Sequence, residues 1–178
     1  MRVEAFKNKK DEDKVKRYFK NHKDKRRYPL FIIGMNTGLR IGDIVKLQIK
    51  NFQDGYLILV EGKTHKRKTI VINNELQEVL YDYYPNGLSN DYLFPSQKGG
   101  HIGEVQVWRW FKEAKRKCRI KYNIATHTMR KSLGKKVNDK YGIDETQMIL
   151  GHDNQRDTLR YIGKEQDLLD SILLNINN

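Results

Sequence analysis

Two side chains at positions 127 and 130 form a candidate anion site. His127 and Arg130 stand three residues apart, so a helix would carry the imidazole and the guanidinium on one face. Thr126 precedes them as a candidate N-cap, and a helix N-terminus that bears both groups suits an anion. The pattern HxxR is short and recurs by chance. It therefore gains meaning only together with other residues.

Three further positions carry side chains that could take part in chemistry. Arg40 follows a predicted turn, and Asp43 is spaced to hold its guanidinium by an i,i+3 pair. His152 follows Gly151, which we expect to cap a helix C-terminus and to leave the histidine exposed. Tyr161 lies on a short predicted helix and is one of ten tyrosines. Taken singly, these residues fit equally well a surface arginine, a capping histidine and a packed tyrosine.

The periodicity of the chain predicts the elements that would position these groups. Apolar and β-branched residues between Asn51 and Ile72 predict a three-stranded antiparallel sheet of limited size. Helical spacing predicts a mainly α domain around it, of the α+β class. The predicted helices lie within 7–27, 30–36, 41–47, 74–84, 104–117, 128–139, 145–150, 157–162 and 166–176.

Composition restricts the class of protein. The chain has 178 residues with 35 Lys or Arg and 22 Asp or Glu, which gives a net charge of +13 and predicts a polyanionic partner, most often nucleic acid. Its longest apolar run, Leu30 to Met35, is far shorter than the ~20 residues that span a membrane. Residues 1–27 contain no apolar signal segment, so we expect no secretion and a cytoplasmic location. Cys118 is the single cysteine, which excludes an intrachain disulfide.

The joint order of the candidate residues is more specific than any one of them. The segment Thr37-Gly38-Leu39-Arg40-Ile41-Gly42-Asp43, a hairpin lysine, the HxxR pair, Leu150-Gly151-His152 and a tyrosine nine residues further on follow one another. This order resembles the catalytic domain of the tyrosine recombinase (phage-type integrase) family, from about Tyr28 to Tyr161. The departures are Lys131, where many relatives have histidine, and Met129, where leucine is usual.

The resemblance implies a site made of Arg40, Lys63, His127, Arg130, His152 and Tyr161. In it Tyr161 attacks the scissile phosphate of duplex DNA, forming a 3′-phosphotyrosine and a free 5′-hydroxyl. The two arginines would neutralise the nonbridging oxygens, to which His152 would also donate, and His127 would take the tyrosine proton. Lys63 matches the family's general acid, with Lys66 and Lys68 as rivals. Since no metal-ligand set is evident, we expect no metal and no cofactor. The covalent intermediate would keep the phosphodiester energy in the tyrosyl bond, so we expect no need for ATP.

The resemblance also implies how the chain is organised and what it assembles with. We expect a charged segment or linker over residues 1–27, a catalytic domain over residues 28–165 and a tail helix over residues 166–178. Relatives usually carry a separate DNA-clamping domain before the catalytic one. They act as tetramers on paired sites, in some cases with accessory DNA-bending proteins, and often belong to phages and other mobile elements. The apolar tail residues Leu168, Leu169, Ile172, Leu173 and Ile176 would then dock on a neighbouring subunit or on their own domain.

The predicted helix 104–117 combines aromatic and basic residues. We expect Val105, Trp108 and Phe111 on its apolar side and lysines and arginines along DNA. Two other functions share this pattern in part. A type IB topoisomerase has a similar site but relaxes DNA alone, and a noncatalytic regulator would keep the fold for DNA binding only. His65 and His101 have no partner pattern and receive no role.

Overall fold

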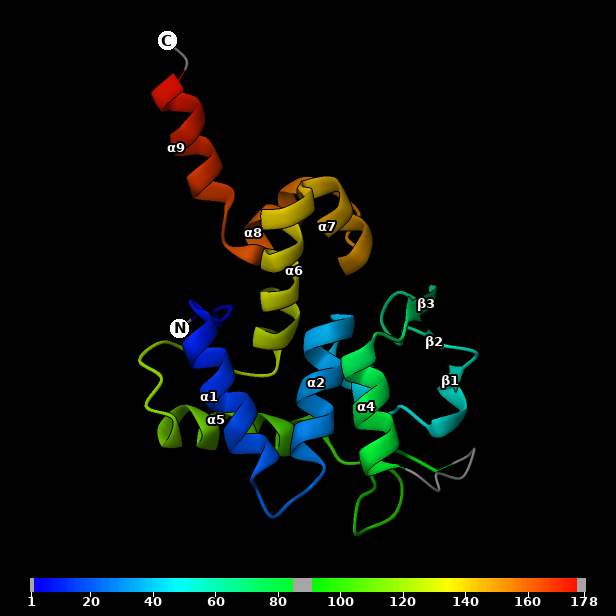
Figure 1. Ribbon diagram of the computed structural model, residues 1–178. Coiled ribbons are helices and arrows are strands. Elements are labelled where there is room, and N and C mark those ends of the chain that lie inside the picture. The colour runs from blue at the N-terminus through cyan, green and yellow to red at the C-terminus, as the bar shows by residue number, and fades with distance from the viewer. Residues whose placement is uncertain (1, 85–90, 176–178) are drawn as a thin grey trace.

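The computed structural model describes residues 2–84 and 91–175. Its helices contribute most of one buried apolar core, and a small sheet lies at one side of the helices (Figure 1). The helices are α1 Lys9–Lys20, α2 Arg27–Thr37, α3 Ile41–Ile44, α4 Asn74–Tyr83, α5 Glu104–Lys117, α6 His127–Tyr141, α7 Ile143–Leu150, α8 Gln155–Ile162 and α9 Glu165–Asn175. A 3₁₀ turn covers Ile49–Asn51. The strands are β1 Phe52–Gln53, β2 Tyr56–Val60 and β3 Arg67–Val71.

The sheet is antiparallel in the order β1-β2-β3, which confirms the predicted sheet. Leu57 and Leu59 of β2 face the core, as the alternation of side chains along a strand requires. Leu59 is opposite Lys68 of β3, so Lys68 lies on the inward face as well. The sheet therefore presents one basic side chain toward the body of the domain.

The helix predictions agree with the structure to within a few residues. Helix α5 has the predicted bounds, whereas α2 begins at Arg27, two residues before Pro29. A proline in the first turn of a helix costs little, because N–H groups there have no carbonyl partner within the helix. The predicted last residue of the tail helix, Ile176, lies outside the described residues.

The core includes part of the charged N-terminal segment. Phe19 of α1 is buried against Phe31 of α2 and Phe111 of α5, with ring centroids 5.6 and 5.5 Å apart. The apolar side predicted for α5 was wrong in part, since Val105 and Trp108 are exposed. The buried side instead consists of Val107, Trp110, Phe111 and Ala114. Residues 108 and 110 are about 200° apart on a helix, so only one of the two tryptophans reaches the core.

Two glycines allow α6 to pass close to its neighbours. A Cβ atom at Gly34 of α2 would overlap the side chain of Met129. At Gly134 a Cβ atom would lie 2.9 Å from Leu150 Cδ1 of α7 and 3.0 Å from Ile162 Cγ2 of α8. The small residues therefore bring α2, α7 and α8 against the helix that begins at His127.

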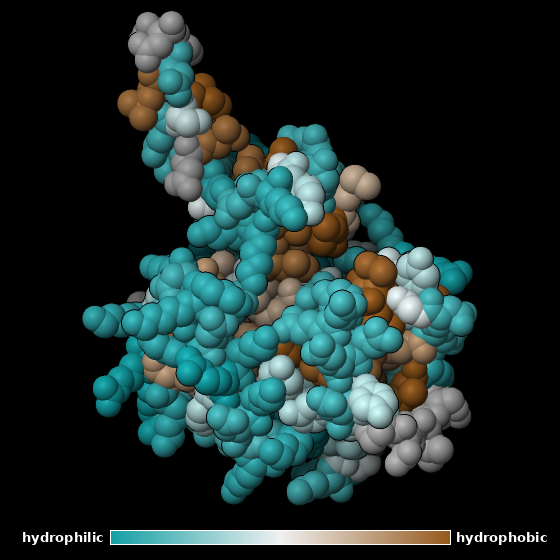
Figure 2. Space-filling view, viewed as in Figure 1, coloured by the Kyte–Doolittle hydropathy of each residue, from teal (hydrophilic) through white to brown (hydrophobic). Residues whose placement is uncertain are grey.

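Helix α9 extends away from the rest of the molecule (Figure 1). Its apolar side chains gather on the surface of this extension (Figure 2), where Leu168 is 44% exposed and Leu173 68%. The apolar face of α9 is therefore exposed to solvent in this single chain.

Among residues 2–84 and 91–175 no helix is both long and apolar enough to cross a membrane.

Candidate active site

The N-terminus of α6 carries the two residues that the HxxR pattern singled out. His127 is the first residue of α6 and lies at the surface, whereas Arg130 is buried one turn later. Thr126 makes no capping hydrogen bond through its side chain, contrary to expectation. The Thr128 hydroxyl instead accepts from the Ala125 amide and donates to the Glu4 carbonyl. The start of α6 is thus tied to the N-terminal segment.

Arg130 is held by backbone carbonyls from two other segments. Its guanidinium donates to the Gly38 carbonyl, after α2, and to the Leu150 carbonyl, at the end of α7. Two of its five N–H groups are thereby used, and the fork is fixed in one orientation. The guanidinium carbon lies 5.9 Å from the centroid of the Tyr161 ring. This buried cation therefore lies beside the candidate nucleophile, and among the described residues no carboxylate forms a salt bridge with it.

Tyr161 and His127 form the central contact of the site. The Tyr161 hydroxyl lies 3.1 Å from His127 Nδ1, although 34 residues separate them in the chain. Burial raises the pKa of Tyr161, so its phenol stays protonated at neutral pH. Desolvation, and then the charges of Arg130 and Lys131, lower the pKa of His127. A neutral imidazole at hydrogen-bond distance is suited to accept the phenol proton.

His152 joins this pair from the loop between α7 and α8. Gly151 caps α7 in the left-handed conformation (φ 64°), as predicted. The His152 ring centroid lies 5.2 Å from that of Tyr161, and its Nδ1 lies 3.1 Å from the Thr158 hydroxyl. The ring is half-buried rather than exposed, because α8 packs beside it. Four predicted residues, His127, Arg130, His152 and Tyr161, are thus brought together.

Arg40 approaches the site from α3 with a partner other than the predicted one. Its Nη1 lies 3.1 Å from Oε1 of Glu61, and the predicted pair with Asp43 does not form. Arg40 is the N-cap of α3 with an extended backbone (ψ 148°), so the helical i,i+3 geometry does not apply. Asp43 Oδ1 instead accepts a hydrogen bond of 2.8 Å from the Gly62 amide. Asp43 therefore fixes the β2–β3 turn rather than the arginine.

The β2–β3 turn offers two lysines in different settings. Lys63 is exposed and lines, together with Arg40 and His127, a cavity of about 350 Å³. Lys68 is half-buried, donates to the Ile149 carbonyl at 2.6 Å, and lies 3.9 Å from Glu61. Burial lowers the pKa of Lys68 to about 8, although Glu61 opposes the shift. Lys66 is exposed and pairs with Asp153, away from this cluster.

Two charged residues of the site were missed from the sequence. Glu61 is only 3% exposed, and its position continues the inward alternation of Leu57 and Leu59. That alternation was a signal that could have identified it. Lys131 is also buried, with its ammonium 5.0 Å from the centroid of the Tyr161 ring. Arg130 and Lys131 are consecutive residues of α6, and consecutive side chains of a helix point in different directions. Helical spacing therefore does not predict that both approach Tyr161.

The balance of groups favours an anionic ligand. Three cations, Arg40, Lys68 and Arg130, converge on a region with two carboxylates, Glu61 and Asp43. Arginine forks match the oxygens of a phosphate in geometry and charge. In the part of the chain that the structure describes, no group of three or more His, Cys, Asp and Glu side chains is arranged to hold a metal ion.

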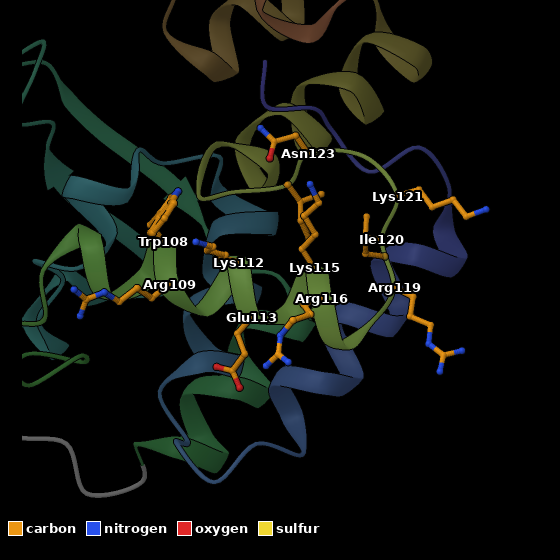
Figure 3. A pocket seen from close by; sticks show the side chains of 11 residues that line it. Trp108, Arg109, Lys112, Glu113, Lys115, Arg116, Arg119, Ile120, Lys121 and Asn123 are labelled. Carbon is orange, nitrogen blue, oxygen red and sulfur yellow. The ribbon is translucent and has the colours of Figure 1, made fainter. Parts of the chain in front are cut away.

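A second basic surface lies along α5 and the loop that follows it. A cavity of about 980 Å³ is lined there by Trp108, Arg109, Lys112, Glu113, Lys115, Arg116, Arg119, Ile120, Lys121, Asn123 and Ile124 (Figure 3). Trp108 is 47% exposed, and the Lys112 ammonium lies 5.2 Å from its ring centroid. We call the residues that line this cavity the α5 face. Since Glu104 of the same helix lines the cavity of Arg40 and His127, the α5 face adjoins the candidate active site.

Comparison with known proteins agrees with the class that this fold and site define, the tyrosine recombinases. Residues 9–167 match the model of the phage integrase family, and the chain belongs to that family. It is 40% identical over 156 residues to the probable integrase/recombinase YoeC of Bacillus subtilis, covering 86% of this chain and 85% of YoeC. It is 32% identical over 139 residues to the tyrosine recombinase XerA of Pyrococcus furiosus, covering 73% of this chain and 48% of XerA.

Solved structures show the same fold at low sequence identity. A crystal structure of XerA recombinase superposes with a TM-score of 0.74 at 20% identity, covering 90% of this chain and 61% of that chain. A lambda integrase dimer bound to a COC' core site gives a TM-score of 0.75 at 17% identity, covering 92% and 61%. The mainly helical domain with a three-stranded antiparallel sheet is thus the catalytic-domain fold of tyrosine recombinases.

Proposed function

We propose that this chain is the catalytic domain of a site-specific recombinase that cleaves and rejoins duplex DNA through a covalent tyrosine intermediate. The observation that carries this proposal is the position of Tyr161. Its hydroxyl is 3.1 Å from a histidine whose lowered pKa favours the neutral form, and its ring is beside the buried guanidinium of Arg130. A nucleophile, a base and fixed cations are the parts that a metal-free phosphoryl transfer needs.

The cleavage step follows from these positions. Tyr161 Oη attacks phosphorus and transfers its proton to His127 Nδ1, while the bond from phosphorus to the 5′-oxygen breaks. Arg40 and Arg130 stabilise the nonbridging oxygens as charge develops, and His152 adds a hydrogen bond there. Lys63 donates a proton to the leaving 5′-oxygen, since it lines the same cavity as Arg40 and His127. Lys68 is the rival donor, because burial lowers its pKa to about 8.

Rejoining reverses these steps with a new 5′-hydroxyl as the nucleophile. The phosphodiester energy is kept in the tyrosyl phosphate bond, so no ATP is needed. Exchange of strands requires two paired duplexes, for which we propose a tetramer of subunits, assisted by accessory DNA-bending proteins. Integration or excision of a phage or another mobile element, in the cytoplasm, is the setting that such a reaction fits.

Conversion of Tyr161 to Phe tests the proposal. The variant Tyr161→Phe removes only the nucleophilic oxygen, so covalent capture of an end-labelled suicide duplex should be lost while noncovalent binding changes less than twofold, roughly. Tyr81→Phe is the matched control, because Tyr81 is 78% exposed on α4. A retained adduct on a denaturing gel would contradict the assignment. Plasmid relaxation without synapsis would identify a topoisomerase, and binding without any adduct by the unsubstituted chain would identify a regulator.

A further inference from the structure

A buried carboxylate lies inside the cluster that is expected to bind a phosphate. Glu61 Oε1 is 3.1 Å from Arg40 Nη1 and 3.9 Å from Lys68 Nζ, and the residue is 3% exposed. A negative charge at this point repels the ligand that the two cations attract. Its presence therefore requires a role that offsets this cost.

The position and charge of Glu61 are both determined by its surroundings. The residue follows β2 directly, and its amide donates to the Lys66 carbonyl across the turn at 3.0 Å. The Thr64 hydroxyl donates to Glu61 Oε2 at 2.7 Å. Burial favours the neutral acid, but the Thr64 hydrogen bond, Lys68 and Arg40 together hold the pKa of Glu61 below its ordinary value. Glu61 is consequently a fixed anion at neutral pH.

The contacts of Glu61 Oε1 with the two cations are ion pairs, and they leave hydrogen-bonding atoms of the cluster without a partner among the described residues. Arg40 Nη1, Asp43 Oδ2 and Glu61 Oε1 are buried, and none of the three hydrogen-bonds to any residue that the structure describes. Buried polar atoms are normally satisfied, so a cluster of three marks a place prepared for a further group. Of these three atoms, Arg40 Nη1 is the donor, so it can donate a hydrogen bond to a phosphate oxygen.

We propose that Glu61 is a positioning residue, which holds the Arg40 guanidinium and the Lys68 ammonium in place before DNA arrives and keeps the ammonium charged in a buried site. The inference rests on the proposed function, since it assigns these cations to the scissile phosphate. Without the carboxylate, Arg40, Lys68 and Arg130 would repel one another more strongly, and among the described residues Asp43 would remain to offset this repulsion. The ligand would then meet a site that is less ordered and in which Lys68 is more often neutral.

Removal of the Glu61 charge should change the pKa of Lys68 in one direction. Glu61 and Asp43 raise the pKa of Lys68, whereas burial, Arg130 and Arg40 lower it. In Glu61→Gln the stronger of the two raising charges is absent, so Lys68 loses its proton at a lower pH. The neutral fraction of Lys68 at pH 7 then rises, so the ammonium that should contact the phosphate is lost in part.

Two measurements on the full chain test this inference. The first is the reactivity of Lys68 toward acetic anhydride across pH, quantified by mass spectrometry against the exposed Lys50. We expect it to rise on the order of fivefold at pH 7 in Glu61→Gln, as a fall of about one pKa unit would produce. The second is single-turnover cleavage of a suicide duplex. It should slow by about fivefold at pH 8, and activity should be lost at a lower pH than in the unsubstituted chain as the pH is raised.

Controls separate positioning from a general loss of structure. Glu78→Gln removes an exposed carboxylate from α4 and should change neither readout. Glu61→Asp keeps the charge and should restore part of the reactivity profile, even if Glu61→Gln folds poorly. An unchanged Lys68 profile in Glu61→Gln would overturn the inference. The acetylation experiment needs no DNA, so it tests the role of Glu61 independently of cleavage. If the unsubstituted chain formed no covalent adduct with DNA, the proposed function would be contradicted, but the acetylation result would still decide the role of Glu61.

Discussion

The candidate active site and the α5 face use the same residue types in opposite ways. In the site, Arg130 is 2% exposed and donates to two backbone carbonyls, and Arg40 is paired with a buried carboxylate. On the α5 face, Arg109, Lys112 and Arg116 are exposed. The difference indicates that chemistry requires cations at fixed positions, whereas holding a duplex requires only a density of charge. Substitutions should therefore affect rate in one region and affinity in the other.

The largest effect is expected from Lys63→Ala. Loss of a general acid should slow cleavage by roughly 10²–10⁴-fold, because a 5′-alkoxide leaves poorly without a proton. A 5′-bridging phosphorothiolate should restore the rate, since a thiolate leaves without protonation. The comparison is made by single-turnover cleavage of the two substrates, with DNA affinity measured in parallel.

Lys66→Ala and Lys68→Ala decide whether an exposed or a buried lysine donates the proton. Lys66 is the matched control within the same turn, because it is exposed and pairs with Asp153 outside the cluster. Rescue by the phosphorothiolate in Lys68→Ala, and its absence in Lys63→Ala, would reassign the general acid to Lys68. In that case the buried region would supply all the groups that act on the phosphate.

The pH dependence of cleavage should report two groups of the candidate active site, His127 and Lys68. His127 must be neutral to accept a proton, and its pKa is lowered by desolvation and by Arg130, so activity should fall only below the ordinary histidine pKa. Lys68 must be charged, and its pKa of about 8 implies that activity falls as pH rises through that value. Each limb should approach a tenfold change per pH unit. An acidic limb above the ordinary histidine pKa would refute the assignment of His127.

Local patterns predicted the fold, although two of the partners predicted within one helix, the Thr126 cap and the Arg40–Asp43 pair, were wrong. The sheet, the bounds of α5 and the left-handed cap at Gly151 all depend on neighbours within a few residues, and the structure confirms them. The joint order of the motifs then identified Tyr161, which its own short helix could not distinguish from the other tyrosines. The structure places it against His127.

Contacts between distant segments were beyond local patterns. The partner of Arg40 was predicted as Asp43 on the assumption of a helix, but the extended backbone at Arg40 turns its side chain toward the sheet. The buried face of α5 and the burial of Lys68 depend on how elements distant in the sequence pack together. The spacing of apolar residues within one element does not determine that packing. Glu61 was visible in the alternation of β2, yet a charge at an inward position contradicts the usual pattern and was not assigned a role.

A smaller effect is expected on the α5 face. The variant Lys112→Gln/Arg116→Gln removes two exposed charges at i and i+4 on one side of the helix. If both contact phosphates, the slope of log affinity against log salt should decrease by about 1.8, with cleavage of bound DNA unchanged. Lys20→Gln/Lys50→Gln, at exposed positions outside the face, is the matched control. Equal slopes for the two double variants, measured by fluorescence anisotropy, would contradict a DNA contact at α5.

The affinity of this chain for DNA should itself be weak and steeply dependent on salt. The net charge of +13 and the exposed basic residues of the α5 face imply that phosphate contacts dominate binding here. We expect little preference between a candidate site and random duplex at physiological salt. Tight, sequence-specific binding by these 178 residues would instead locate base readout within this domain.

The smallest effect should come from the tail, which belongs to neither region. Leu169 and Leu173 of α9 are 49% and 68% exposed, so deletion of residues 167–178 should leave the thermal midpoint of the single chain nearly unchanged. If the tail docks on a neighbouring subunit, the deletion should weaken cooperative binding to paired sites by roughly fivefold, equivalent to about 1 kcal/mol of contact. Leu169→Gln/Leu173→Gln should reproduce this loss, and Asp170→Asn, on the same helix, should not. Unchanged cooperativity, or a large fall in the thermal midpoint, would show that the tail packs on its own domain, and the placement of Tyr161 would then be independent of assembly.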